Sequence, residues 1–120
     1  MNFAALLLMY FFAWNTTVMK EISAIDLKKK LATGEPVELI DVREAYEHEE
    51  DNIGGSLMPL SSLFEFVNQI PKDKPVILYC QKGIRSMIAI QRLADRSGFE
   101  NLINLRGGID AYRSVAADND

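Results

Sequence analysis

The stretch from Val76 to Ser86, VILYCQKGIRS, decides how this chain is expected to fold. An apolar run of strand length, Pro75 to Cys80, ends at the only cysteine of the sequence. A short loop with one glycine and two cations then leads into a helix-like segment. A run that is apolar throughout is typical of a strand covered on both faces. This order places Cys80 at the edge of a sheet, where backbone N–H groups and the positive end of a helix favour a thiolate over a thiol.

The flanking sequence continues an alternation of strands and helices. Two further apolar runs predict strands at 37–40 and 101–105. The predicted helices are a segment capped by Ser23 and stopped at Gly34, residues 43–50, 61–70 and 85–97, and a short helix after Gly107-Gly108. Strands alternating with helices imply an α/β fold with a largely parallel sheet. Reactive loops in such folds follow the carboxyl ends of the strands, where both Asp41 and Cys80 are expected.

The candidate site is the loop that follows Cys80. If this loop curls around the sulfur, successive backbone N–H groups point inward and form a concave anion site. A glycine there permits backbone angles that other residues resist, and two cations add positive charge. The alternative is a buried, inert cysteine at the end of a core strand, which is common for free cysteines. The position of Cys80 at the end of a strand, the two cations and the glycine together favour a nucleophilic role for Cys80. The loop residues are Gln81, Lys82, Gly83, Ile84, Arg85 and Ser86.

Three other polar features are assigned mainly structural roles. Ser86 is expected to cap the following helix and to hydrogen-bond the sulfur. Asp41 and Arg43 are expected to form a pair that stabilises the fold, with Arg43 facing a substrate as the alternative. His48 lies in an acidic run and is interpreted as a surface or half-packed imidazole and not as a base.

Composition excludes several classes of function. The 120 residues suffice for one domain, and 48% hydrophobic with 25% charged residues is ordinary for a globular protein. A net charge of -4 argues against nucleic acid as the main partner, because phosphate binding requires a basic face. One cysteine forms no internal disulfide, and four cysteine or histidine ligands for a structural zinc ion are not present. The sequence therefore predicts neither a metal nor a cofactor.

Residues 1–19 form a separate zone without a charged side chain. Three interpretations fit it: a weak membrane anchor, a helix packed on the domain or on a partner, and an upstream extension with the functional start at Met19. The apolar part, 3–14, spans only about 18 Å as a helix, short of a bilayer core of about 30 Å, so an extension or packing helix is favoured. If the segment is an anchor, the lysines that follow it keep the domain in the cytoplasm, which is also the expected location without an anchor.

Four motifs in order resemble those of single-domain rhodaneses, a family of thiosulfate-type sulfurtransferases. The segment 39–44 resembles the family's D-V-R element, and 52–56 resembles its H-I-x-G-A element. Residues 80–86 resemble the loop C-x-x-G-x-R-S, and 105–108 with Tyr112 resemble L-x-G-G and its aromatic. The resemblance covers about residues 20–115, and we assign 20–120 to this domain. It implies a mostly parallel central sheet of about five strands with helices on both faces. Asn52, Asp51 and Tyr112 depart from the frequent family residues but lie outside the cysteine loop.

The resemblance also implies a reaction. The Cys80 thiolate takes the outer sulfur of thiosulfate or of a persulfide donor and carries it as a persulfide, and an external thiol, a protein acceptor or cyanide then removes it. Lys82 and Arg85 are the candidates for recruiting a small anionic donor.

Two other functions stay open. A sulfur-relay or persulfide-binding module, loaded by a specific protein, fits the same intact loop. A phosphatase is disfavoured, because tyrosine phosphatases place five residues between cysteine and arginine, whereas this loop has four, 81–84.

Overall fold

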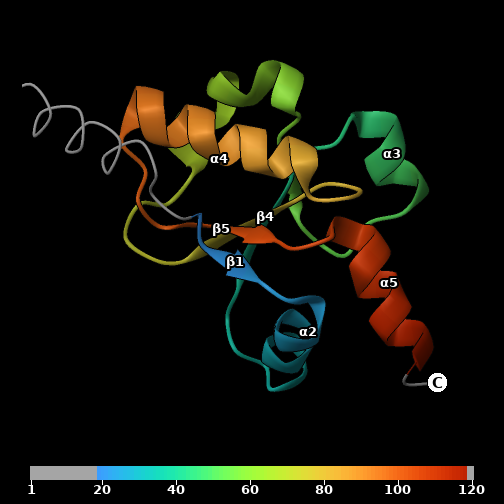
Figure 1. Ribbon diagram of the computed structural model, residues 1–120. Helices are drawn as coiled ribbons and strands as arrows, with labels where there is room; N and C mark the ends of the chain where they lie inside the picture. The colour runs from blue at the N-terminus through green and yellow to red at the C-terminus, as the bar shows by residue number, and fades with distance from the viewer. Residues whose placement is uncertain (1–18, 119–120) are drawn as a thin grey trace, which may run out of the picture.

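A computed structural model describes residues 19–118, with side chains described as far as residue 115 (Figure 1). The sequence-based interpretations of residues 1–18 lie outside the described residues. The elements in chain order are β1 (Glu21–Ile22), α2 (Ala24–Ala32), β2 (Glu38–Asp41), α3 (Ala45–Glu50), β3 (Ser56–Leu57), η1 (Leu60–Gln69), β4 (Val76–Tyr79), α4 (Ile84–Ser97), β5 (Leu102–Leu105) and α5 (Gly108–Asp118).

The five strands form one parallel sheet in the order β1-β5-β4-β2-β3, which confirms the predicted α/β fold. The strand β4 lies in the centre, paired with β2 on one side and β5 on the other. Because all strands are parallel, their carboxyl ends share one edge of the sheet. The loops after β2, β4 and β5 therefore meet beside Cys80.

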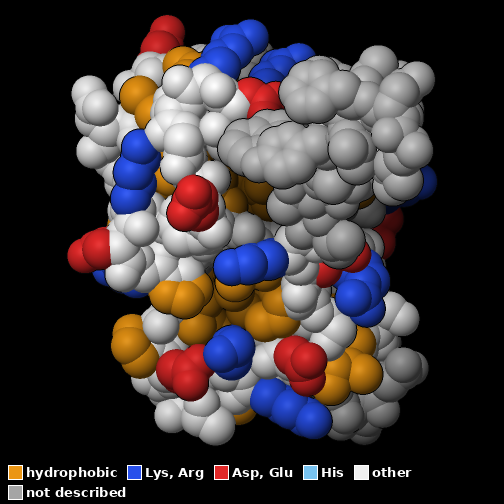
Figure 2. Space-filling model, turned by 60° about the vertical axis from the view of Figure 1, so that its left-hand side comes forward, with side chains coloured by type: hydrophobic (Ala, Val, Ile, Leu, Met, Phe, Trp, Pro, Cys, Tyr) orange, Lys and Arg blue, Asp and Glu red, His pale blue; other side chains and the backbone are white. Residues whose placement is uncertain are grey.

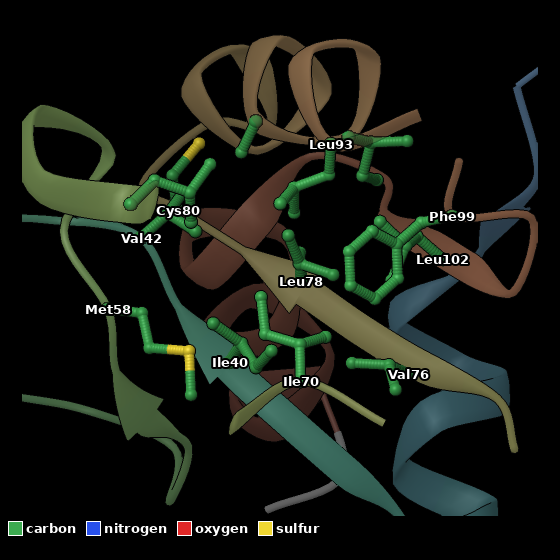
Figure 3. Close-up of a cluster of buried hydrophobic side chains, with 13 residues drawn as sticks. Ile40, Val42, Met58, Ile70, Val76, Leu78, Cys80, Leu93, Phe99 and Leu102 are labelled. Carbon is green, nitrogen blue, oxygen red and sulfur yellow. The ribbon is translucent and has the colours of Figure 1, made fainter. Parts of the chain in front are cut away.

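Helices cover both faces of the sheet, as expected (Figure 1). Side chains of β4 alternate between the two faces, because successive residues of a strand point in opposite directions. Ile77 and Tyr79 pack with Leu27 of α2 and Ile109 of α5. On the other face, Val76, Leu78 and Cys80 belong to a larger cluster under α4 and η1, and Figure 3 shows Cys80 in it beside Val42. The candidate nucleophile is thus built into the main core.

The predicted cap of the first helix is confirmed, and the helix predicted over 61–70 has a different form. Ser23 caps α2, because its hydroxyl accepts a hydrogen bond from the backbone N–H of Asp26 at 3.1 Å. The helix predicted over 61–70 is instead the 3-10 element η1, broken at Ser62, where φ is -129° and ψ is 23°. Serine competes with helical hydrogen bonds through its own hydroxyl, which favours such a break.

The described surface has a mixed charge. On the face shown in Figure 2, basic and acidic side chains are interspersed around an apolar hollow, and neither sign forms an extended patch on that face. Within residues 19–118, none of the helices has the length and apolar character needed to cross a membrane.

Candidate active site

The loop after β4 wraps around the sulfur of Cys80, whose side chain is only 1% exposed. The backbone N–H of Gly83 donates to Sγ at 3.1 Å, and that of Ser86 donates at 3.4 Å. The Ser86 hydroxyl oxygen also lies 3.4 Å from Sγ. The predicted cradle of N–H groups is therefore present, with the sulfur at its centre.

Carbonyl groups of the same loop point the other way, towards the first turn of α5. The N–H of Ile109 donates to the carbonyl of Cys80 at 3.0 Å, and the N–H of Asp110 donates to that of Gln81 at 3.1 Å. Both donors belong to the first turn of a helix, where N–H groups have no partner inside the helix. This contact orients two peptide units so that the remaining N–H groups of the loop face the sulfur.

Opposing effects act on the pKa of Cys80. Burial of the sulfur raises it, but the hydrogen bonds from the Ser86 hydroxyl and from the N–H groups of Ser86, Gly83 and Lys82 outweigh burial. The net result is a thiol pKa below its ordinary value. The geometry thus favours a thiolate, which is the nucleophilic form of cysteine.

The structure corrects the role predicted for Ser86, which does not cap the helix α4. Gly83, with φ of 94°, occupies the N-cap of α4, so Ser86 lies inside the first turn and does not cap the helix. Its hydroxyl oxygen lies 2.5 Å from the Asn104 side-chain oxygen and 3.4 Å from Sγ, so its single proton is donated to one of the two at a time. The Asn104 amide donates to the Gly83 carbonyl at 3.2 Å. The sequence interpretation missed Asn104 as a residue that holds the cysteine loop, although a polar residue inside the apolar strand β5 was a signal of it.

Asp41 and Arg43 form the buried pair that was expected. The guanidinium Nη2 donates to Asp41 Oδ2 at 2.9 Å, and the side chains are 0% and 3% exposed. His48 Nδ1 lies 2.9 Å from the same carboxylate oxygen, with the imidazole 21% exposed, so its half-packed state agrees with the prediction. Burial opposes ionisation of Asp41, but hydrogen bonds from Arg43 and His48 keep its pKa below the usual value.

The remaining loop residues lie at the mouth of the site. Gln81 donates to Asp110 Oδ1 at 2.6 Å and accepts from Arg43 Nη1 at 3.2 Å. Lys82 and Ile84 are exposed. Arg85 makes a two-point ion pair with Glu47 of α3, at 2.7 and 2.9 Å, a partner that the sequence did not reveal.

Among the side chains that the structure describes, residues 19–115, histidine, cysteine, aspartate and glutamate form no group of three that could hold a metal ion. The site therefore consists of one sulfur, a ring of N–H donors and paired charges.

The sequence model of the rhodanese-like domain matches residues 23–115. The chain belongs to this family. A rhodanese-like domain protein from Staphylococcus aureus superimposes with a TM-score of 0.72 and 29% identity, over 78% of this chain and 91% of that one. The rhodanese-like fold that the motifs implied is thus confirmed.

Relatives of this rhodanese-like domain include proteins named for sulfur transfer. It is 35% identical over 96 residues to a sulfurtransferase of Allochromatium vinosum, covering 79% of this chain and 89% of that protein. It is 30% identical over 97 residues to the thiosulfate sulfurtransferase GlpE of Coxiella burnetii, covering 80% and 86%. It is also 45% identical over 76 residues to the uncharacterized protein YqhL of Bacillus subtilis, covering 62% and 60%.

Proposed function

We propose that this rhodanese-like domain is a sulfurtransferase in which Cys80 carries a sulfane sulfur as a persulfide. The observation that carries the proposal is the convergence of N–H donors and one hydroxyl on a sulfur whose thiol pKa is lowered. The names of two relatives support the same class of activity.

In the first step, the Cys80 thiolate attacks the outer sulfur of thiosulfate or of a persulfide. A new S–S bond forms to Cys80 while the S–S bond of the donor breaks, and sulfite or a thiolate leaves with the electron pair. The charge of the product then resides on the outer sulfur of Cys80. The N–H groups of Gly83 and Ser86 contact Sγ itself, so they stabilise the Cys80 thiolate that attacks the donor and that the second step regenerates.

In the second step, an external acceptor removes the sulfur. A thiolate or cyanide attacks the outer sulfur, the S–S bond to Cys80 breaks, and the Cys80 thiolate is regenerated. Cys80 is the only cysteine of the chain, so no second thiol of the chain takes the sulfur from it. The acceptor proposed here is therefore a free thiol, cyanide or a cysteine of another protein.

The test is intact-protein mass spectrometry after incubation with thiosulfate and, separately, with an alkyl persulfide, both without reductant. The expected result is a gain of about 32 Da that is lost on adding a thiol and is absent from Cys80→Ser. The serine variant keeps the size of the side chain, which separates the chemistry from the packing. An unchanged mass with both small donors would contradict the proposal as stated. Transfer at the normal rate by Cys80→Ser would show that the nucleophile is wrongly assigned.

A further inference from the structure

The charges around the cysteine loop are almost fully compensated. Of the three cations nearest the loop, Arg43 is paired with buried Asp41, and Arg85 is paired with Glu47. Lys82 is exposed and belongs to no ion pair among the described side chains, residues 19–115. The sequence alone suggested two cations free to attract an anion, and the structure leaves one.

The pair between Glu47 and Arg85 is held firmly. Both guanidinium nitrogens Nη1 and Nη2 contact the two carboxylate oxygens, and such two-point pairs are among the stronger hydrogen-bonded pairs. The Glu47 side chain is 17% exposed, and its Oε1 also accepts from the backbone N–H of Glu44 at 3.1 Å. Hydrogen bonds from Arg85 lower the pKa of Glu47 to about 2, so the carboxylate stays charged near neutral pH.

Arg85 is close enough to Cys80 for their charges to interact, and Glu47 interacts with the charge of Arg43 as well. The negative charge of Glu47 therefore cancels part of the positive field that a donor meets at the sulfur. This cancellation matters most for a donor with two negative charges, because the interaction energy scales with the charge of the donor.

We propose that Glu47 sets donor specificity by neutralising Arg85, so that alkyl persulfides with at most one charge are favoured over dianions such as thiosulfate. Glu47 is a positioning residue in this scheme, because it acts through Arg85 and does not contact the reacting sulfur. The proposal rests on the sulfurtransferase function proposed above.

Exposed apolar side chains next to the loop agree with this choice. Ile84 and Met87, in the first turns of α4, are 63% and 39% exposed, and Tyr46, beside Glu47 in α3, is 70% exposed. The apolar side chains of Ile84 and Met87 suit the carbon skeleton of an alkyl persulfide and carry no donor for the oxygens of thiosulfate, whereas the Tyr46 ring adds apolar area and one hydroxyl.

Either donor loads the enzyme by a balanced step. An alkyl persulfide R–S–SH gives Cys80–S–SH and the thiolate R–S⁻, and thiosulfate gives Cys80–S–S⁻ and sulfite. No oxidant or reductant is consumed in either step, because one S–S bond forms for each that breaks.

The experiment measures kcat/KM with thiosulfate and with the persulfide of N-acetylcysteine methyl ester, which lacks a carboxylate, using one thiol acceptor throughout. Glu47→Gln keeps an oxygen for the Glu44 N–H and removes the charge. We expect it to raise the ratio of thiosulfate to persulfide kcat/KM about fivefold, through KM for thiosulfate, and the gain to shrink at high ionic strength. Glu49→Gln, an exposed charge removal on the same helix, is the matched control and leaves the ratio within about twofold.

Arg85→Gln tests the same idea in the opposite direction, because it leaves the Glu47 charge uncompensated. We expect the ratio to fall by about fivefold. An unchanged ratio in both variants, or an equal rise in Glu49→Gln, would overturn the proposal. A purely structural effect of Glu47 would change the two donors in parallel. If neither donor loads wild-type Cys80, the sulfurtransferase proposal itself fails, whereas loading by both with an unchanged ratio refutes only the role of Glu47.

Discussion

Gly108 is the residue at which a single methyl group tests the architecture of the site. Its φ is +60°, and a Cβ placed there would lie 2.4 Å from the Cys80 carbonyl oxygen and 2.5 Å from that of Gln81. Both obstacles are backbone atoms, so no side-chain rotation relieves the clash. Gly108→Ala should therefore push the cysteine loop away from α5 and weaken the bond from Ile109 N–H to the Cys80 carbonyl.

The magnitude follows from comparison with Gly98, which ends α4 with φ of +69° and has no atom within 4 Å of an added Cβ. Gly98→Ala meets only the left-handed backbone penalty, about 1 kcal/mol. Gly108→Ala meets the same penalty plus overpacking, about 2 kcal/mol more. We expect a total near 3 kcal/mol, a large share of the roughly 5–15 kcal/mol by which domains are stable.

Urea unfolding of the two alanine variants beside wild type measures this difference. The rate of alkylation of Cys80 by iodoacetamide as a function of pH gives a second, local readout, and Gly108→Ala should shift its midpoint upward. If Gly108→Ala is no less stable than Gly98→Ala and alkylates like wild type, then the close contact between α5 and the loop does not shape the site.

Three further predictions follow from the site. Ser86→Ala removes the hydroxyl beside Sγ and should raise the pKa of Cys80, seen as an alkylation midpoint at higher pH; an unmoved midpoint would assign the stabilisation to the N–H groups alone. Asp41→Asn leaves the Arg43 guanidinium buried without its counter-charge and should cost about 3 kcal/mol in urea unfolding; a loss below about 1 kcal/mol would contradict the importance of this pair. Glu47 has a folded pKa of about 2 against 4.5 ordinarily, so its stabilisation is present above pH 4.5 and is lost as the pH falls towards 2. Glu47→Gln should flatten the decline of thermal stability in that window, and an equally steep decline would show that other carboxyl groups cause it.

Local patterns in the sequence were sufficient to predict the central unit of the fold. The apolar run before Cys80, the glycine after it and the helical segment beyond correspond to β4, the loop and α4. The two-residue strands Glu21–Ile22 and Ser56–Leu57 are too short to show any periodicity, so pairing with β5 and β2 alone defines them.

The sequence did not reveal the partners of Arg85 and Ser86, because both partners are far away along the chain. Glu47 and Arg85 are 38 positions apart, and an acidic run ordinarily marks only a solvated surface. That run instead supplies the partner that changes the expected role of Arg85. Ser86 was assigned to a helix cap because serine is common there, but the left-handed backbone of Gly83 took that position. Hydrogen bonding to Asn104 then gave Ser86 a different partner.

The contact between α5 and the cysteine loop has a consequence for the order in which the protein is made. Cys80 leaves the ribosome before Ile109 and Asp110, whose N–H groups hold the two loop carbonyls in place. A nascent chain that ends before α5 has the thiol but lacks the contact that turns the loop N–H groups towards it. We therefore expect the cysteine to stay an ordinary and less reactive thiol during synthesis until α5 folds against the sheet.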